Sequence, residues 1–211
     1  MYAKCFKRVL DFLFSLLAIL VLSPLLLVLT AAGAVVMQGN PFFIQKRPGH
    51  KEKIFSLVKF RSMTCAVDGE GNLLPDDKRL TKYGKFLRKT SMDELPELWN
   101  ILIGDMSLIG PRPLLVEYLP RYNEEQRRRH DVRPGLTGYA QVHGRNAVTW
   151  EEKFRMDLCY VENISFSMDL KIFFKTISSV IRRDGISSET CETMEPFTGS
   201  ELKNTETVDV G

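Results

Sequence analysis

A run of 26 residues without a charged side chain, Phe12 to Met37, constrains this chain of 211 residues more than any other feature. As a straight helix rising 1.5 Å per residue, the run would be about 39 Å long, whereas the hydrocarbon core of a bilayer is about 30 Å thick. The run is also too long for a typical signal peptide, and it lacks a small-residue cleavage site. The sequence therefore predicts a membrane helix.

Ser23 and Pro24 interrupt this run near its middle. Pro24 cannot donate a hydrogen bond to the carbonyl of Leu20, so a kink is expected, with Ser23 available to satisfy a freed backbone group. Basic residues flank the run on both sides: Lys4, Lys7 and Arg8 before it, and Lys46, Arg47, Lys51 and Lys53 after it. The positive-inside rule places both flanks in the cytoplasm, which favours a re-entrant helix over a kinked single span, although both readings stay open.

The net charge of +3 hides an asymmetry. The tail at 186–211 holds six acidic residues and one lysine, a net charge of −5, which leaves +8 for residues 1–185. A basic folded part suits anionic partners such as membrane lipid or a phosphorylated substrate. Because no nucleic-acid-binding motif accompanies the charge, nucleic acid is not expected as a partner. The tail, rich in Ser, Thr and Glu, is expected to be flexible.

The rest of the chain predicts a mainly α fold, of α+β type with a few short strands. Ile54–Phe60 has the composition of a strand, and glycine and proline mark loops at Pro41, Pro48-Gly49 and 68–77. The last of the helical patterns carries an apolar stripe suited to core or membrane-surface packing. The patterns lie at about Leu95–Ile103, Leu115–His130, Thr149–Val161 and Met168–Arg182. Four cysteines without C-x-x-C spacing predict free thiols.

The segment SMDELPELWN, residues 91–100, places two adjacent carboxylates, Asp93 and Glu94, at a helix start. Ser91 and Glu94 fit a capping box, in which each side chain satisfies a backbone donor of the first turn. Pro96 would then fall at the fifth helical position, where its missing N–H removes a hydrogen bond. The carboxylates are therefore alternatively expected on an irregular turn before a helix that begins near Leu95.

Three arginines lie in turns made rigid by glycine and proline: Arg112 in GPRP, and Arg133 and Arg145 in RPGLTGYAQVHGRN. Arginine is the side chain best shaped for bidentate contact with phosphate, so these three predict a convergent anion site. The run from Arg127 to Arg129 is instead expected on a solvated or lipid-facing helix surface.

Taken together, several blocks in order resemble the bacterial sugar transferase family, the monotopic phosphoglycosyl transferases that start glycan assembly on polyprenyl phosphate. The resemblance covers residues 1–185, and the short chain looks like the minimal members typified by the enzymes of bacterial N-linked protein glycosylation. It rests on the apolar run with Ser23-Pro24, QKRPG at 45–49, KFRSM at 59–63, SMDELPELWNILIGDMSLIGPRP at 91–113 and RPGLTGYAQVHGRN at 133–146.

The resemblance implies a re-entrant membrane helix at 1–38, broken at Ser23-Pro24, and a catalytic domain at 39–185 on the cytoplasmic face of the bacterial inner membrane, with interfacial amphipathic helices. The acidic tail at 186–211 follows. In the family, the residue matching Asp93 attacks the sugar-bearing phosphorus of a UDP-sugar, expels UMP and forms an aspartyl phosphosugar, which polyprenyl phosphate then takes over. Downstream glycosyltransferases are implied as further partners.

A carboxylate that approaches a diphosphate meets like-charge repulsion, so the site needs a divalent cation and fixed positive charges. Mg²⁺ takes one or two carboxylates, which Asp93 and Glu94 supply, plus phosphate oxygens and water. The cations expected to bind the phosphates are Lys59, Arg88, Arg112 and Arg145.

His143 departs from the QVNGRN that minimal members commonly carry, and it is expected to be a surface or packing residue. The sugar is expected to be an N-acetylated hexose, by similarity to the minimal glycosylation enzymes. Two other functions remain as alternatives: an aspartyl-phosphate phosphohydrolase anchored in the membrane, and a non-catalytic scaffold on a single span.

Overall fold

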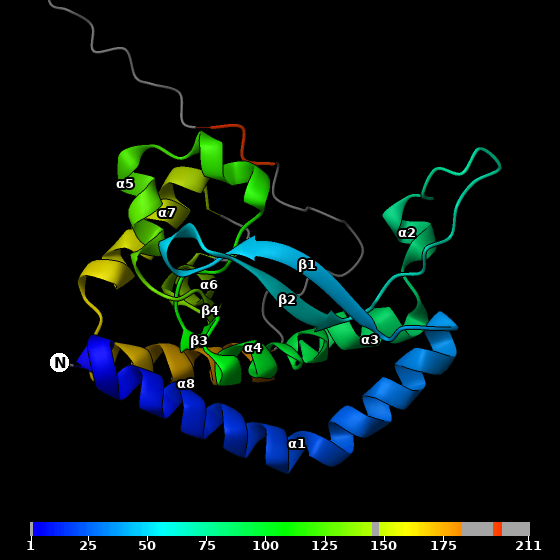
Figure 1. Ribbon diagram of the computed structural model, residues 1–211, viewed down its shortest axis with the longest axis horizontal. Coiled ribbons are helices and arrows are strands. Elements are labelled where there is room, and N and C mark those ends of the chain that lie inside the picture. The colour runs from blue at the N-terminus through cyan, green and yellow to red at the C-terminus, as the bar shows by residue number, and fades with distance from the viewer. Residues whose placement is uncertain (1, 145–147, 183–195, 200–211) are drawn as a thin grey trace, which may run out of the picture.

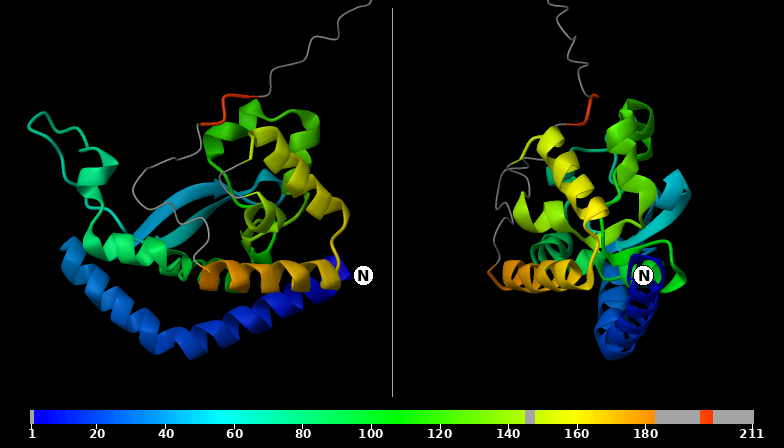
Figure 2. Two further views of the ribbon diagram at one scale, coloured as in Figure 1. Left: turned by 180° about the vertical axis from the view of Figure 1, so that it is seen from behind. Right: turned by 90° about the vertical axis from the view of Figure 1, so that its left-hand side faces the viewer.

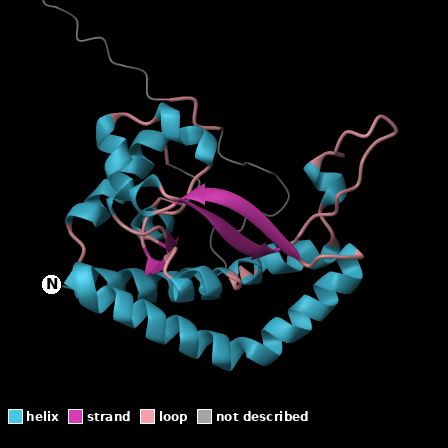
Figure 3. Cartoon of the chain, in the orientation of Figure 1, coloured by secondary structure: helices cyan, strands magenta, loops and turns pink. Residues whose placement is uncertain are grey.

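The computed structural model describes residues 2–144, 148–182 and 196–199. The described chain is mostly helical with four short strands, as predicted (Figure 3). In chain order the elements are η1 (Tyr2–Phe6), α1 (Lys7–Met37), β1 (Phe42–Pro48), η2 (His50–Glu52), β2 (Ile54–Phe60), α2 (Asp76–Arg79), α3 (Lys82–Lys89), η3 (Met92–Glu94), α4 (Glu97–Ile103), β3 (Ser107–Ile109), η4 (Val116–Arg121), α5 (Glu124–Arg127), η5 (Arg128–Asp131), β4 (Gly135–Thr137), α6 (Tyr139–His143), α7 (Trp150–Glu162) and α8 (Phe166–Arg182).

Helix α1 is continuous for 31 residues and bends near its middle (Figure 1). Pro24 lies inside the helix, and the hydroxyl of Ser23 donates to the carbonyl oxygen of Leu20 at 2.8 Å. The predicted kink and the predicted role of Ser23 are confirmed, whereas the predicted helix break at Ser23-Pro24 is wrong, because α1 is one helix from Lys7 to Met37. Within the described residues, α1 is the one helix long and apolar enough to cross a membrane, and only 11% of its most apolar 18-residue window is buried.

Both arms of α1 are tied to the rest of the fold. In the first arm, Arg8 donates to the carbonyls of Ile101 and Leu102 at 2.6 and 2.8 Å, at the end of α4. In the second arm, the carbonyl of Leu29 accepts a hydrogen bond from the hydroxyl of Tyr83 on α3 at 2.7 Å. The two arms therefore rise from the bend toward the same body of the protein (Figure 1).

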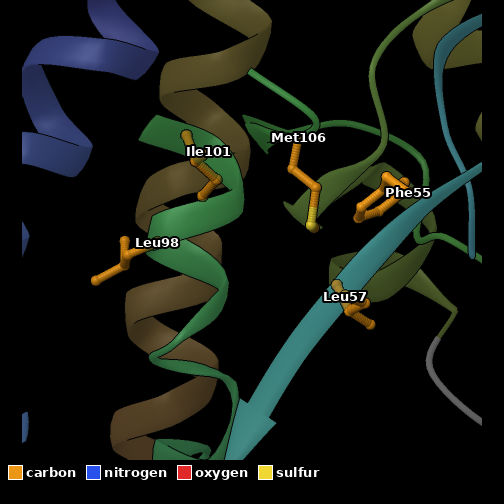
Figure 4. Packing of buried hydrophobic residues seen from close by; sticks show 5 residues of the cluster. All are labelled: Phe55, Leu57, Leu98, Ile101 and Met106. Atoms are coloured by element: carbon orange, nitrogen blue, oxygen red, sulfur yellow. The ribbon is translucent and has the colours of Figure 1, made fainter. Parts of the chain in front are cut away.

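The hairpin of β1 and β2 covers α4 and forms one hydrophobic core with it. The strands pair antiparallel from Phe42 opposite Phe60 to Pro48 opposite Ile54. This core contains Phe55, Leu57, Leu98, Ile101 and Met106, and Figure 4 shows Ile101 of α4 near Met106, with Phe55 and Leu57 at β2 and Leu98 on the other side of α4. Strand β2 confirms the prediction at Ile54–Phe60, whereas β1 was missed because its bounding prolines indicated a loop.

A second layer contains the parallel pair of β3 and β4 with α6, α7 and α8. Ser107 pairs with Gly135 and Ile109 with Thr137, which places the GPRP turn beside the RPGLTG segment. Helix α8 begins close to the start of α1, where Lys7 donates to Asp169, and runs away from α1 toward its C-terminal end (Figure 2). Exposed apolar side chains gather on α1, α4 and α8. They include Leu17 and Val21 of α1, Trp99 of α4, and Phe173 and Phe174 of α8.

The predicted helix at Leu115–His130 is wrong. The segment instead forms η4, α5 and η5, because Pro120 interrupts the pattern and Asn123 caps a new helix through a capping box with Gln126. The predicted helices at Thr149–Val161 and Met168–Arg182 correspond to α7 and α8, and Thr149 caps α7 through a capping box with Glu152.

The predicted flexibility of the tail stays a prediction, since only residues 196–199 of it are described, and among these Phe197 is 1% exposed. The rest of the tail, at 186–195 and 200–211, lies outside the described residues. Cys65 and Cys159 are free thiols, as predicted.

Gly84 is a position where α3 packs against the backbone without room for a side chain. A Cβ there would lie 1.9 Å from the carbonyl oxygen of Ser62. We expect Gly84→Ala to destabilise the protein by about 1–3 kcal/mol, the usual effect of overpacking. Thermal unfolding of the purified protein in detergent measures the change. Gly69→Ala is the matched control because a Cβ there meets nothing within 4 Å, and equal melting temperatures for the two variants would refute the close packing.

Candidate active site

The turn before α4 presents the two adjacent carboxylates. Ser91 has a left-handed backbone with φ 55° and ψ 19°, and its side chain makes no capping hydrogen bond, so the predicted capping box is wrong. Met92–Glu94 forms the single turn η3, and α4 begins at Glu97 with Pro96 as its N-cap residue. The alternative prediction, an irregular turn before the helix, is therefore confirmed.

Glu94 is held between two cations from distant segments. Its Oε1 lies 2.7 Å from Nζ of Lys59 on β2 and 2.5 Å from Nη2 of Arg112 in the GPRP turn. Burial alone would raise the pKa of Glu94, but the charges of Arg112 and Lys59 and their hydrogen bonds outweigh it and lower the pKa to about 2. Glu94 is therefore ionised at neutral pH and fixes both cations.

Asp93 differs from its neighbour because no described residue forms a hydrogen bond or ion pair with its carboxylate. Burial raises the pKa of Asp93 above its usual range, and the charge of Glu94 raises it further. Opposite shifts in two adjacent carboxyls are typical of sites where the two groups have different roles. Asp93 is thus a partly buried carboxylate whose oxygens remain available to a ligand.

Asp93 and Glu94 line a pocket of about 600 Å³, a volume in the usual range for small-molecule sites. Its wall combines the cations Arg88, Arg112 and Lys153 with apolar residues of α6 and α8. The full lining is Arg88, Lys89, Ser91, Asp93, Glu94, Leu95, Leu108, Ile109, Arg112, Leu136, Thr137, Ala140, Gln141, Val142, Lys153, Phe173, Thr176, Ser179 and Val180. Basic and apolar surfaces therefore meet beside Asp93.

The structure brings most of the predicted cations to this site. Arg88 lines the pocket, and its Nε donates to the hydroxyl of Ser62 at 3.0 Å. Lys59 lies behind Glu94 rather than among the lining residues. Arg145 lies outside the described residues, so its prediction stays untested.

The prediction that Arg133 joins Arg112 in one anion site is wrong. Arg133 is not among the described lining residues, and its Nε donates to the carbonyl of Gly104 at 2.9 Å, beyond the end of α4. His143 is exposed, and its ring lies on that of Tyr139 with centroids 4.0 Å apart. The expectation of a surface or packing role for His143 is confirmed.

Arg129 corrects the prediction for the basic run. Arg127 and Arg128 form exposed ion pairs, but Arg129 is 3% exposed and its Nη2 lies 2.7 Å from Oδ2 of Asp157 on α7. The same nitrogen donates to the backbone carbonyl of Arg112 at 2.8 Å. Arg129 therefore supports the turn that carries Arg112.

Sequence reasoning also missed two charged residues at the site. Glu97 is 2% exposed, and its Oε1 lies 3.0 Å from Nζ of Lys59 but makes no hydrogen bond to described residues. Burial, assisted by the charge of Glu94, raises the pKa of Glu97 to about 7. Lys153 lies 4.7 Å from the ring centroid of Trp150, and burial lowers its pKa to about 8. The partner of Glu97 comes from β2, so nothing local in the sequence marks it, whereas Lys153 lies one turn after Trp150 in the same helix, a spacing that sequence reasoning did not use.

Comparison with known proteins identifies the family of the chain. The family model of bacterial sugar transferases matches residues 2–183. The chain belongs to the bacterial sugar transferase family. It is therefore an enzyme, and the family inferred from the sequence is confirmed.

The relatives differ in length. An uncharacterized sugar transferase of Bacillus subtilis (strain 168), EpsL, is 51% identical over 195 residues, which cover 92% of this chain and 96% of the relative. The undecaprenyl-phosphate galactose phosphotransferase of Salmonella typhimurium is 37% identical over 87% of the chain. The UDP-glucose:undecaprenyl-phosphate glucose-1-phosphate transferase of Klebsiella pneumoniae is 40% identical over 82%. The matches cover only 42% and 39% of these two relatives.

The two neighbouring arginines of η5 provide a test of the buried ion pair. We expect Arg129→Met to lower the free energy of unfolding by about 3–5 kcal/mol, because it leaves Asp157 charged and buried without its partner. Arg128→Met removes an exposed pair with Glu162 and should lower the free energy of unfolding by less than about 1 kcal/mol. Guanidinium unfolding in detergent measures both changes. Similar midpoints for the two variants would contradict a structural role for Arg129.

Proposed function

We propose that the protein transfers a sugar 1-phosphate from a UDP-sugar to a polyprenyl phosphate and releases UMP. The observation that supports this most is the carboxylate of Asp93, which has no partner among the described residues and lines a pocket that also holds Arg88 and Arg112. The names of the Salmonella and Klebsiella relatives describe this type of transfer for those proteins.

In the proposed first step, a carboxylate oxygen of Asp93 attacks the phosphorus that carries the sugar. The bond from this phosphorus to the UMP oxygen breaks, and UMP leaves with its electron pair. In the second step, a phosphate oxygen of the polyprenyl phosphate attacks the same phosphorus and Asp93 is released as a carboxylate. The reaction is of the ping-pong type because the first product leaves before the acceptor reacts.

The arginines of the pocket counter the repulsion between Asp93 and the diphosphate. Arg88 and Arg112 line the same pocket as Asp93, and Arg145 is proposed to join them. Glu94 keeps Arg112 and Lys59 in place through its two contacts. Fixed cations cost no reorganisation when charge develops on the leaving group, which is how such sites lower a barrier.

Mg²⁺ is proposed as the cofactor, with Asp93 and Glu94 as the protein ligands. No group of three or more His, Cys, Asp or Glu suited to a metal occurs in the part of the chain that the structure describes. The residues nevertheless fit Mg²⁺, which needs only one or two carboxylates when substrate phosphate and water complete its shell. When bound, it would neutralise charge on the phosphate oxygens.

The pocket also suits an acceptor that lies in the membrane. Phe173 and Val180 of α8 line the pocket and are 45% and 50% exposed, so the apolar surface of α8 reaches its rim. An acceptor phosphate at the membrane surface would thus enter beside Asp93, while the nucleotide sugar arrives from water. The identity of the sugar stays a prediction, and an N-acetylated hexose is one candidate.

The decisive experiment is to incubate the purified protein with Mg²⁺ and one UDP-sugar at a time, without lipid acceptor. The panel contains UDP-glucose, UDP-galactose and UDP-N-acetylglucosamine. Intact mass should show one phosphosugar per chain together with free UMP, and polyprenyl phosphate should remove the adduct. Asp93→Asn should lower adduct formation by at least about 10³-fold, the scale seen when a nucleophile is removed.

Asp77→Asn is the matched control because Asp77 is an exposed residue of α2. An adduct that persists in Asp93→Asn would refute the role of Asp93. Release of UMP with free sugar phosphate, without any need for polyprenyl phosphate, would instead indicate a phosphohydrolase.

We also propose that α1 enters one leaflet of the bacterial inner membrane and returns, with the catalytic part in the cytoplasm. Three observations support re-entry: the bend at Ser23-Pro24, the contact of Arg8 with α4, and the contact of Tyr83 with Leu29. A straight span would carry the two arms to opposite faces of the membrane and would break one of these contacts.

Single-cysteine labelling in a background without native cysteines tests this topology. Cysteines introduced at Ala3 and at Gln38 lie before and after α1. We expect a membrane-impermeant maleimide to label both only after the cytoplasmic side is opened. Labelling of one site in intact cells and of the other only after lysis would refute re-entry.

A further inference from the structure

Phe197, in the acidic C-terminal segment, is a buried anchor on the catalytic domain. Its ring stacks with that of Tyr122 at a centroid distance of 5.7 Å, and it meets the edge of Phe154 at 5.1 Å. Trp150 and Tyr118 complete the contacts at 5.5 and 5.7 Å. These four aromatic residues, which come from η4, the segment after it and α7, form the Phe197 socket.

The main chain of the segment is fixed as well. A guanidinium nitrogen of Arg121 donates to the carbonyl oxygen of Phe197, and the same guanidinium lies 5.6 Å from the ring centroid of Tyr118. By contrast, the neighbouring Thr198 is exposed. One side chain and one backbone carbonyl thus hold the segment at a defined place.

The far side of the socket touches the arginine that supports the active-site turn. The guanidinium carbon of Arg129 lies 5.8 Å from the ring centroid of Phe154 and 6.0 Å from that of Tyr122. Arg129 in turn pairs with Asp157 and donates to the carbonyl of Arg112. A continuous set of contacts therefore leads from Phe197 to the turn that carries Arg112.

A second set of contacts leads from the socket to the pocket through Trp150. The ammonium of Lys153 lies 4.7 Å from the ring centroid of Trp150, and Lys153 lines the pocket. Trp150 packs against Phe154 at 5.7 Å with the rings nearly parallel, and against Phe197 on another side. Two cations of the pocket, Arg112 and Lys153, are thus supported from the same aromatic cluster.

We propose that Phe197 is a positioning residue for the transfer reaction: docked in its socket, it holds Arg129 and Trp150 in place and so fixes Arg112 and Lys153 for binding the nucleotide diphosphate. The inference rests on the proposed function. It assigns the C-terminal segment a role in substrate binding, although this segment lies outside residues 2–183, where the family model matches.

Without Phe197, the rings of Trp150, Tyr122 and Phe154 would face a cavity. Side chains next to a cavity lose packing contacts and gain rotamer freedom, so the cations resting on them would no longer be fixed before the substrate binds. The free energy of nucleotide binding would then include the entropic cost of ordering the side chains of Arg112 and Lys153. The effect should appear in affinity for the nucleotide.

The test compares three variants of the full chain in lipid nanodiscs: Phe197→Ala, Phe197→Tyr and Thr198→Ala. We expect Phe197→Ala to raise both the Kd for UMP, measured by calorimetry, and the KM for the UDP-sugar by about tenfold. Phe197→Tyr retains the ring and should stay within about threefold of the wild type. Thr198→Ala changes an exposed side chain of the same segment and should stay within about twofold.

Rescue in trans separates positioning from general loss of stability. A peptide of residues 194–202, added at millimolar concentration, should return the KM of Phe197→Ala toward that of the wild type. The same peptide with alanine in place of phenylalanine should not. A folded Phe197→Ala variant with unchanged Kd and KM would overturn the proposal, as would equal rescue by both peptides.

Should Phe197→Ala fail to fold, Phe197→Leu takes its place, because leucine fills most of the socket. We expect a rise of about two- to fivefold in Kd and KM, and unchanged values would overturn the proposal. Failure of the proposed function would show differently: the wild type would form no phosphosugar adduct and release no UMP. Under that outcome the comparison of UMP affinities still decides the role of Phe197.

Discussion

The contact of Glu94 with two cations is the interaction on which the active site depends. One carboxylate oxygen accepts hydrogen bonds from Lys59 and Arg112, whose positions lie 35 residues before it and 18 after it. It thereby joins the β-hairpin and the GPRP turn to the start of α4. The adjacent Asp93 is left without a partner among the described residues, which is the position that the proposed reaction requires of a nucleophile.

The same helix connects the site to α1. Helix α4 begins three residues after Glu94, and its Trp99 and Ile103 are 57% and 56% exposed. The end of α4 also accepts the hydrogen bonds of Arg8 that hold the first arm of α1. If α1 enters the membrane as proposed, these contacts would fix the height of the pocket above the bilayer, as the proposed transfer from a water-soluble donor to a lipid acceptor would require.

Local features of the fold could be predicted from the sequence, and features that depend on distant partners could not. The strand Ile54–Phe60 and helix α8 follow from short patterns, as does the kink at Pro24. The burial of Arg129 depends on Asp157, which lies 28 residues later. In the sequence, nothing distinguishes Arg129 from the neighbouring Arg127 and Arg128. Ser91 was wrongly predicted as a cap because its left-handed backbone follows from how α3 leads into η3. Phe197 gave no signal because its four aromatic contacts come from segments far away in the sequence.

The opposite pKa shifts of the two carboxyls follow from this arrangement and suit the two different roles proposed for them. Glu94 stays ionised because two cations stabilise its charge, with a pKa of about 2. Asp93 has its pKa raised by burial and by the charge of Glu94, so its carboxylate is more basic than one in water. A more basic oxygen is the better nucleophile toward phosphorus, provided that it is ionised when the substrate binds. A metal ion and the diphosphate-binding cations would favour that ionised form, so the charge that brings in the donor would also prepare Asp93 to react with it.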